Sequence, residues 1–475
     1  MLAEPLRQRR EAIADCLVAT AVLLAVIVGF LMLTLVSLGI HYEVHTFGYD
    51  EPTSDSPGIL VPLDLGGSIE AGLPITGKLV LDGVLLCTLR PSLSLRAFVY
   101  PDDGVCAITM FNSLFVTGGS TLIPPYKSDL QRFLDTASHH TKTEYGIGID
   151  HKFCRNETFM STLVAEQATK TSLDEMWSHR VYHYGQVNTP PILAGFDTFQ
   201  YIMQSAKGLQ IISELMKDKA DSETEPSYTI LHYPLMYESM AADVAKALTA
   251  YPVDLFVAFG YTAYSDYGKK DCRMVPPVLH STKLLEPALL KDAYPVRLVR
   301  VISALANLKK EWPNTTALAV SLGMGGRWYI PAFPDRHIDI PGNYSLGHHC
   351  KASSRADSPA RDQISSIAEC CEDPNYNQTF SFDSIFQAMF AYDKSDHMLF
   401  TYDSAASFRL KLCDTKKNVT DLLYNIVADD IQYDDIENIC GYGEYSRLHT
   451  LNRVAAFLGK NYTSPDQGTT CKLLT

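Results

Sequence analysis

Positive charge is scarce in this sequence: 40 Lys and Arg residues stand against 54 Asp and Glu residues, for a net charge of -14. Proteins that bind nucleic acid carry a basic surface, so this balance argues against nucleic acid as a partner. Cysteine pairs with the C-x-x-C spacing of zinc sites are also absent from the sequence. We interpret the remaining metal candidates, His183 and the adjacent pair His348 and His349, as hydrogen-bonded or solvated. We therefore expect no metal and no cofactor.

Charged side chains are missing between Cys16 and Leu38, a run of 23 residues. As a helix this run would be ~34 Å long, enough to cross a hydrocarbon core of about 30 Å. Three arginines, Arg7, Arg9 and Arg10, precede this run, and no Lys or Arg follows it until Lys78. This asymmetry predicts a single-pass type II membrane protein with a cytoplasmic tail (1–15), a transmembrane signal-anchor (16–38) and the bulk extracellular or lumenal. The alternative is a signal peptide cleaved near Gly39, which would give a secreted protein.

The cysteines and glycosylation motifs fit an oxidising compartment. Ten cysteines follow the apolar run, an even number that allows up to five disulfides. Six N-x-[ST] motifs also follow it, at Asn156, Asn314, Asn343, Asn377, Asn418 and Asn461. Because such motifs are glycosylated in the secretory pathway, the sequence predicts a glycoprotein.

The composition and hydrophobic pattern of the sequence change near residue 80. Residues 39–79 are rich in Gly, Pro, Ser and Asp and are typical of a stalk. Eight strand-length apolar runs then alternate with amphipathic stretches, at Val84–Leu89, Val105–Phe115, Tyr145–Asp150, Val181–Val187, Tyr228–Leu231, Leu255–Tyr261, Ala317–Leu322 and Tyr424–Ala428. Runs without polar alternation indicate parallel strands that are covered on both faces. We expect an α/β fold, a (β/α)8 TIM barrel over residues 80–455, with a doubly wound open sheet as the alternative.

Two other segments depart from this alternation of apolar runs and amphipathic stretches. Residues 335–385 carry three cysteines, two glycosylation motifs and many Ser and Asp residues. They predict a disulfide-braced insertion after the seventh strand. Residues 456–475 form a C-terminal tail.

Several short motifs follow one another along the chain: Val84–Cys87 with Tyr100–Cys106, Asp254–Thr262, Gly326–Tyr329, Phe400–Ser407 and Tyr433–Asp435 with Cys440. In this order, from about residue 80 to 450, the chain resembles the family 18 chitinases. The resemblance implies a Cys87–Cys106 disulfide. It also matches Tyr261 to the tyrosine that follows the family's sixth strand, with Thr262 in place of the family's aspartate.

The family's acidic motif is missing. Active members carry D-x-x-D-x-D-x-E at the end of the fourth strand, and the final Glu is the general acid. Here no Asp or Glu occurs between Glu175 and Asp197. Without a proton donor the leaving alkoxide is poor, so we expect a degenerate, catalytically inactive member with no catalytic residues. A divergent glycosidase that uses other carboxylates is the alternative.

Other carboxylates are weaker candidates. Asp150, Asp266 and Asp429 are interpreted as solvated loop acids, although Asp429 falls near the position of the family's sugar-floor tryptophan. The segment Asp430–Glu437 resembles the acidic motif in part but follows the wrong strand.

Ligand binding without hydrolysis remains open, since the family includes inactive lectins. Sugars stack on aromatic faces, and the candidates are Tyr261, Trp328, Tyr329, Tyr182 and Tyr184. Trp328 fits equally well as a core residue beneath the loop after the seventh strand. The sequence therefore predicts a glycan or protein ligand without identifying it.

Overall fold

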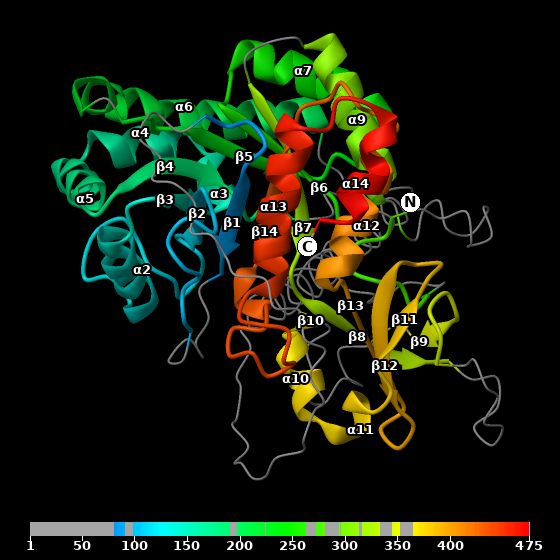
Figure 1. The fold of residues 1–475 in the computed structure, drawn as a ribbon. Coiled ribbons are helices and arrows are strands. Elements are labelled where there is room, and N and C mark those ends of the chain that lie inside the picture. Colours follow the sequence, from blue (N-terminus) through cyan, green and yellow to red (C-terminus); the bar gives the residue numbers. More distant parts are fainter. Residues whose placement is uncertain are drawn as a thin grey trace, which may run out of the picture. The chain divides into compact units, whose positions relative to one another are not determined.

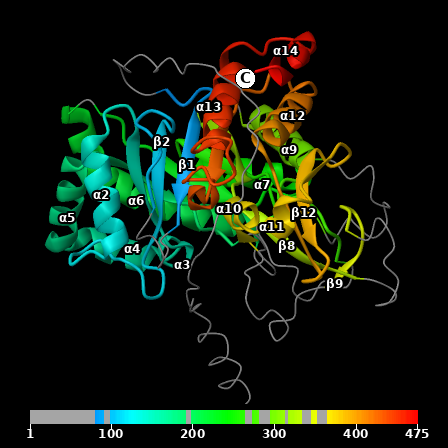
Figure 2. The same ribbon diagram turned by 60° about the horizontal axis from the view of Figure 1, so that its bottom comes forward.

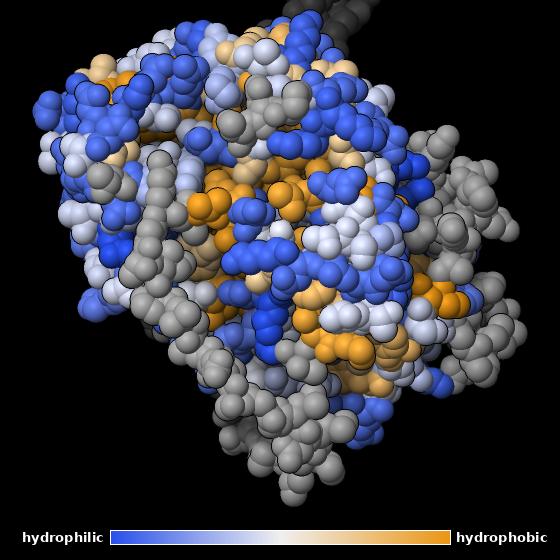
Figure 3. Space-filling model, turned by 45° about the horizontal axis from the view of Figure 1, so that its top comes forward, coloured by the Kyte–Doolittle hydropathy of each residue, from blue (hydrophilic) through white to orange (hydrophobic). Residues whose placement is uncertain are grey.

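The computed structural model describes residues 80–474, except 91–97, 191–196, 224, 263–271, 281–293, 295, 313–315, 333–343 and 352–363. The predicted anchor and stalk, Asp266, Asn314 and Asn343 lie outside these residues. Within them, no helix has both the length and the apolar character needed to cross a membrane. On the face drawn in Figure 3, hydrophilic residues separate the hydrophobic areas that the described residues expose.

Eight parallel strands close into a barrel (Figure 1). They are β1 (Leu85–Leu89), β2 (Ile108–Leu114), β3 (Glu144–Ile149), β4 (Val181–Gln186), β5 (Thr229–Tyr233), β6 (Leu255–Phe259), β7 (Ala317–Gly323) and β14 (Asn425–Asp429). Each of the eight predicted apolar runs contains most of one barrel strand. Strand β1 pairs with both β2 and β14, which closes the ring, so the open-sheet alternative is wrong.

Helices surround this barrel and follow most of its strands (Figure 1). They are α2 (Ser128–His139), α3 (His151–Cys154), α4 (Glu157–Ala165), α5 (Gln167–Ser178), α6 (Thr198–Glu223), α7 (Ala241–Ala250), α9 (Leu298–Glu311), α12 (Ala405–Lys416), α13 (Ser446–Lys460) and α14 (Gly468–Lys472). Asp197 caps α6 by accepting a hydrogen bond from the backbone N–H of Gln200. Gly208 is needed within α6 because a Cβ there would lie 1.8 Å from the carbonyl oxygen of Cys154.

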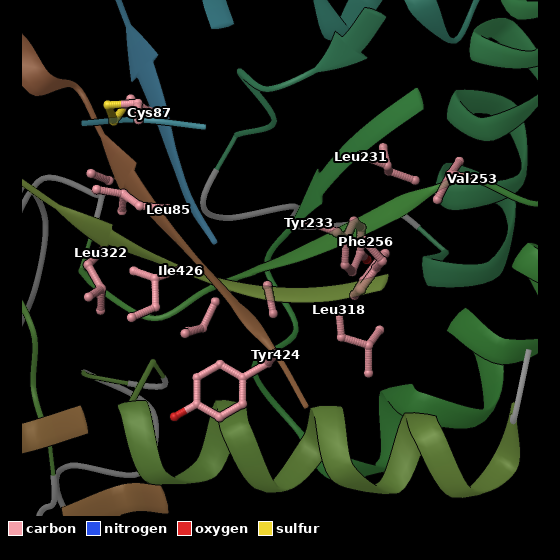
Figure 4. Close-up of a cluster of buried hydrophobic side chains, with 14 of the residues drawn as sticks. Leu85, Cys87, Leu231, Tyr233, Val253, Phe256, Leu318, Leu322, Tyr424 and Ile426 are labelled. Carbon is pink, nitrogen blue, oxygen red and sulfur yellow. A yellow bond between two sulfur atoms is a disulfide. The ribbon is translucent and has the colours of Figure 1, made fainter. Parts of the chain in front are cut away.

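The barrel strands are buried on both faces and mostly apolar, as expected for a parallel sheet covered by helices. Side chains on the outward faces pack against the helices; among them are Leu85, Leu231, Phe256, Leu318 and Ile426 (Figure 4). The inward faces form a second cluster inside the barrel, from Leu86, Ile108, Met110, Val187, Ile230, Leu255, Val257, Ala319 and Val427. Which face each residue occupies therefore decides whether a polar side chain reaches the barrel interior.

A second sheet lies between β7 and α12 in the sequence (Figure 2). Its strands are β8 (Gly326–Pro331), β9 (Cys350–Lys351), β10 (Ile364–Ser365), β11 (Ser381–Asp383), β12 (Ala388–Asp393) and β13 (Met398–Tyr402), with short helices α10 (Ile367–Glu372) and α11 (Pro374–Asn377). The sheet spans 326–402, beyond the 335–385 expected for the insertion. Strands β8 and β13 pair with each other rather than with the barrel.

Four disulfides join described cysteines. The predicted Cys87–Cys106 bridge is present, with the two Cα atoms 5.9 Å apart. Two bridges anchor the second sheet (Cys272–Cys350 and Cys371–Cys440), and one joins α12 to α14 (Cys413–Cys471). Cys154 and Cys370 are buried and lie outside these four bridges.

Candidate ligand site at the barrel mouth

The carboxyl end of β4 carries no acid inside the barrel. His183 and Gly185 pair with Gly146 and Gly148 of β3, and Val187 continues the same inward-facing series. A Cβ on Gly148 would lie 2.8 Å from Cγ2 of Val187, so the two strands approach closely here. The family's general acid follows this strand, and the inward position at its end is the buried, apolar Val187.

The inward polar residue lower on β4, His183, has ordinary structural partners. Its Nε2 lies 2.8 Å from a carboxylate oxygen of Glu144, and its Nδ1 accepts a hydrogen bond from the backbone N–H of Tyr228. This agrees with the interpretation of His183 as a hydrogen-bonded histidine.

A buried carboxyl does reach the mouth, from a different strand. Asp429 is the last residue of β14 and is 3 % exposed, so the interpretation of it as a solvated loop acid is wrong. The hydroxyl of Thr88, on β1, donates a hydrogen bond to Asp429 Oδ1 over 3.1 Å. The imidazole Nδ1 of His232, on β5, lies 3.9 Å from the same oxygen. We call Thr88, His232, Tyr261, Ser321 and Asp429 the mouth cluster.

Burial dominates the electrostatics of this cluster. It raises the pKa of Asp429 to about 7, and the charge of Asp430 acts in the same direction. The hydroxyl groups of Ser321, Thr88 and Tyr261 act in the opposite direction and do not overcome burial. Burial also lowers the pKa of His232 to about 3, so this histidine is neutral at physiological pH.

Three polar atoms of the cluster have unused hydrogen-bonding capacity. Asp429 Oδ2, His232 Nδ1 and Ser321 Oγ are buried and make no hydrogen bond of ordinary geometry in the part of the chain that the structure describes, although the Ser321 and Tyr261 hydroxyl groups are close enough to the Asp429 carboxyl to lower its pKa. Buried polar groups in folded proteins are almost always paired with protein, water or ligand. Three such atoms, from β14, β5 and β7, are therefore candidate hydrogen-bonding partners for water or a ligand.

Tyr261, placed just after β6, is the one aromatic candidate that belongs to this cluster. Burial raises its pKa well above 10, and the nearby charge of Asp429 adds to the effect. A Cβ on Gly323, at the end of β7, would lie 2.5 Å from the Tyr261 ring, so only glycine leaves room for the ring there.

Next to the cluster, Asp430 and Arg90 form the rim. An oxygen of Asp430 lies 2.8 Å from Nη2 of Arg90, and the backbone N–H of Asp430 donates to the Thr88 hydroxyl. Asp430 has a left-handed backbone (φ 61°). This turn lets two consecutive carboxylates separate, with Asp429 inside the barrel and Asp430 paired with Arg90.

Asp150, at the end of β3, is also buried rather than solvated. It caps α3 by accepting from the backbone N–H of Lys152, and it accepts from the side-chain amide of Asn188. These bonds give Asp150 a role in holding the loops after β3 and β4.

The other aromatic candidates lie in hydrophobic cores. Tyr182 and Tyr184 are on the outward face of β4, and the Tyr182 ring lies 4.8 Å from that of Trp177 on α5. Trp328 is buried in the second sheet, 4.6 Å from the Phe400 ring, and its indole N–H donates to Ser365. Tyr329 is buried nearby.

The structure thus places the side chains of Tyr182, Tyr184, Trp328 and Tyr329 in hydrophobic cores outside the mouth cluster. Tyr329 donates its hydroxyl to the carbonyl of Val275, inside a core formed with the segment after β6. The sequence reasoning in turn missed Thr88, His232 and Ser321. Each is a single polar residue near the end of an apolar run, and that pattern is the signal by which it could have been found.

A large cavity lies at the opposite end of the barrel. Its volume is about 790 Å³, and it is lined by residues that precede or begin strands, including Tyr228, Asp254 and Ala317. Its position at the amino ends of the strands separates it from the mouth cluster.

The sequence matches no protein-family model and no curated protein. Solved structures do match. A group IV chitinase from Ostrinia furnacalis in complex with allosamidin is 14% identical, with a TM-score of 0.52 over 80% of this chain and 100% of that one. Human YKL-39, described as a pseudo-chitinase that retains chitooligosaccharide binding, is 13% identical, with a TM-score of 0.52 over 78% of this chain and 98% of that one.

The chain has the fold of the family 18 chitinases and chitinase-like proteins. An immunomodulatory active chitinase from Trichuris suis matches equally well (12% identity, TM-score 0.52, 78% of this chain and 98% of that one). Structures of this chitinase-like fold thus include chitinases and a pseudo-chitinase, so the fold alone does not decide whether this chain is an enzyme.

Proposed function

We propose that this chain is a membrane-anchored, chitinase-like glycoprotein that binds a glycan at its barrel mouth without hydrolysing it. One observation carries the proposal: Val187 occupies the inward position at the end of β4, in a stretch without any carboxylate between Glu175 and Asp197. Glycosidic cleavage needs a proton for the leaving oxygen, and general acid catalysis alone contributes about 10²–10⁴ in rate. A valine supplies no proton.

Binding is supported by the polar groups that remain. The mouth cluster presents a carboxyl, an imidazole and hydroxyl groups, three of whose polar atoms make no hydrogen bond of ordinary geometry within the described chain. Sugar hydroxyl groups both donate and accept, so they complement such a set. On β14 the site offers the carboxyl of Asp429 near the position of the family's sugar-stacking tryptophan, which favours hydrogen bonding over stacking there.

The proposal is tested by titrating the full-length chain, purified in detergent, with chitotetraose and by incubating the two together. We expect saturable binding in calorimetry and no shorter oligosaccharides in the product mixture. Tyr261→Phe should weaken binding several-fold, whereas the matched variant Tyr182→Phe, on the outward face of β4, should leave it unchanged. Absence of binding at millimolar sugar would refute glycan binding and leave a protein ligand as the alternative.

The anchor and the glycans rest on the sequence and on exposure. Residues 16–38 have the length and composition of a signal-anchor, and Asn156, Asn418 and Asn461 are exposed. Protease protection of the N-terminal tail in sealed vesicles and N-terminal sequencing of the mature chain test the topology. A mature chain that begins near Gly39 would refute the anchor in favour of secretion.

A second candidate is a divergent glycosidase, and the observation in its favour is Asp429. A buried carboxyl with a pKa of about 7 is the kind of group that acts as a general acid near neutral pH. Its neighbour Asp430 is held by Arg90, which makes it a poor second carboxyl. Cleavage of chitotetraose by the wild-type chain that disappears in Asp429→Asn would establish this function and refute the first.

A further inference from the structure

The mouth cluster contains two groups that meet without bonding to each other. Asp429 Oδ1 and His232 Nδ1 are 3.9 Å apart, which is too long for a hydrogen bond. Asp429 Oδ2, His232 Nδ1 and Ser321 Oγ make no hydrogen bond of ordinary geometry within the described chain. Leaving a buried polar atom unpaired costs about 1–3 kcal/mol. This cost favours a bound group that satisfies several of these atoms at once.

The atoms define what such a group must offer. A protonated Asp429 carboxyl donates one hydrogen bond, and an imidazole nitrogen without a proton accepts one. A single ligand hydroxyl can accept from the carboxyl through its oxygen and donate its own hydrogen to Nδ1 of His232. An anionic ligand would instead meet the negative charge of Asp430 close by.

We propose that the mouth cluster binds a neutral, hydroxyl-rich ligand in a proton-linked manner, with Asp429 as hydrogen-bond donor, and that it releases the ligand when Asp429 ionises. This inference rests on the proposed glycan binding and adds its regulation. Once the carboxyl loses its proton it only accepts, and the ligand oxygen then faces a carboxylate in place of a donor. The ionised carboxylate also stands beside the charge of Asp430.

Two other titratable members of the mouth cluster, His232 and Tyr261, keep one protonation state near neutral pH. From β5, His232 is neutral because burial lowers its pKa to about 3. Tyr261, after β6, keeps its proton because burial raises its pKa well above 10. Arg90, after β1, and Asp430 are paired with each other, and Tyr433 lies beside Arg90. Among the described residues of β7, the Ser321 hydroxyl faces Asp429, and it does not titrate. Asp429 is therefore the group that changes charge near pH 7.

The test measures the affinity of the full-length chain for chitotetraose from pH 5.5 to pH 8.5. We expect the wild-type affinity to fall at least about tenfold over this range, because only the protonated fraction of Asp429 is competent to bind. Asp429→Asn should bind at all these pH values with a nearly flat profile, since the amide donates without titrating. Asp429→Ala, which has no donor, should bind weakly throughout.

A matched control is Asp150→Asn, which changes another buried carboxyl at a strand end and should keep the wild-type pH profile. Thermal melting of every variant at pH 5.5 and pH 8.5 separates loss of binding from loss of folding. Wild-type binding with a flat pH profile, or Asp429→Asn binding with the full wild-type slope, would overturn the proton link while glycan binding stands. No binding at any pH would overturn both.

Discussion

Asp429 at the end of β14 and His232 on β5 face each other inside the barrel, with Oδ1 and Nδ1 3.9 Å apart. Two strands, β6 and β7, separate β14 from β5 around the ring. The contact therefore crosses the barrel interior and gives the mouth a polar side. The carboxyl end of β4, where the family's acid belongs, is apolar at Val187. The buried polar groups of the mouth cluster therefore come from β14, β5, β7, β1 and the residue after β6, and none comes from β4.

The buried carboxyl of Asp429 should make stability depend on pH. Its pKa is about 7 in the folded chain against 3.8 for an ordinary carboxyl, so between these values the folded state binds more protons than the unfolded state. The contribution of Asp429 to the free energy of unfolding should therefore be greatest below pH 4. It should fall as the pH rises from 4 through 7, by up to about 4 kcal/mol in total. Urea unfolding at pH 5 and pH 8 measures the part of this fall that lies between those two pH values, about 2.6 kcal/mol.

Asp429→Asn removes this titration and keeps the shape of the side chain. We expect its unfolding free energy to change less than that of the wild-type chain between pH 5 and pH 8. At pH 8 the variant should be the more stable of the two. An equal loss of stability in both proteins would show that Asp429 is ionised in the folded state without penalty.

Trp328 should matter for stability and not for ligand binding. Its ring packs against Phe400 and Tyr376, and its indole N–H donates to Ser365. Truncation of such a buried aromatic residue, Trp328→Ala, should cost about 3–5 kcal/mol. The milder Trp328→Phe should lower the melting temperature and leave the affinity for chitotetraose unchanged. A large loss of affinity in the folded Trp328→Phe chain would instead place Trp328 at the ligand.

The Cys413–Cys471 bridge should be a major stabiliser of the C-terminal region. It closes a loop with a sequence separation of 58 and joins α12 to α14. In the chain-entropy account a loop of this size contributes about 4 kcal/mol. The double variant Cys413→Ala/Cys471→Ala should lose stability of that order in chemical unfolding.

Non-reducing peptide mapping provides the check on connectivity. It should recover the four described pairs, including Cys413–Cys471. As a control, Cys154→Ala removes a buried thiol outside those pairs and should leave the map unchanged. Recovery of Cys413 or Cys471 in another pairing would contradict the structure.

The barrel was predictable because its strands are buried on both faces. Runs such as Leu255–Phe259 are continuously apolar and of strand length, and helical periods separate them. The second sheet was harder to predict: Ser381–Asp383 is short and mostly exposed, and Gly326–Pro331 resembles a segment that accompanies the barrel. Pairing between distant strands, as in Tyr329 with Leu399, decides that sheet, and it leaves no local pattern.

The site was only partly predictable, for a related reason. A strand that is apolar on both faces does not show which of its faces lines the barrel. Tyr184 and Tyr261 are both tyrosines near strand ends, yet one faces the helices and the other the mouth. His232 and Ser321 become site residues only when the ring closes and brings β5, β7 and β14 together.

Asn156 is expected to have two separable roles, as a glycosylation site and as a helix cap. Its side-chain oxygen accepts a hydrogen bond from the backbone N–H of Phe159 and so caps α4. A glycan attaches to the side-chain nitrogen, which leaves this oxygen able to accept. Asn156→Gln removes both the glycan and the cap, whereas Thr158→Ala destroys the glycosylation motif and keeps the cap.

Both variants should lose the mass of the same glycan after expression in a secretory host, as measured by intact-protein mass spectrometry. Since loss of an N-cap costs about 1 kcal/mol, Asn156→Gln should also be less stable than Thr158→Ala by roughly that amount in urea unfolding. Equal stabilities would show that the capping bond contributes nothing in solution, and equal masses for both variants and the wild-type chain would show that Asn156 carries no glycan.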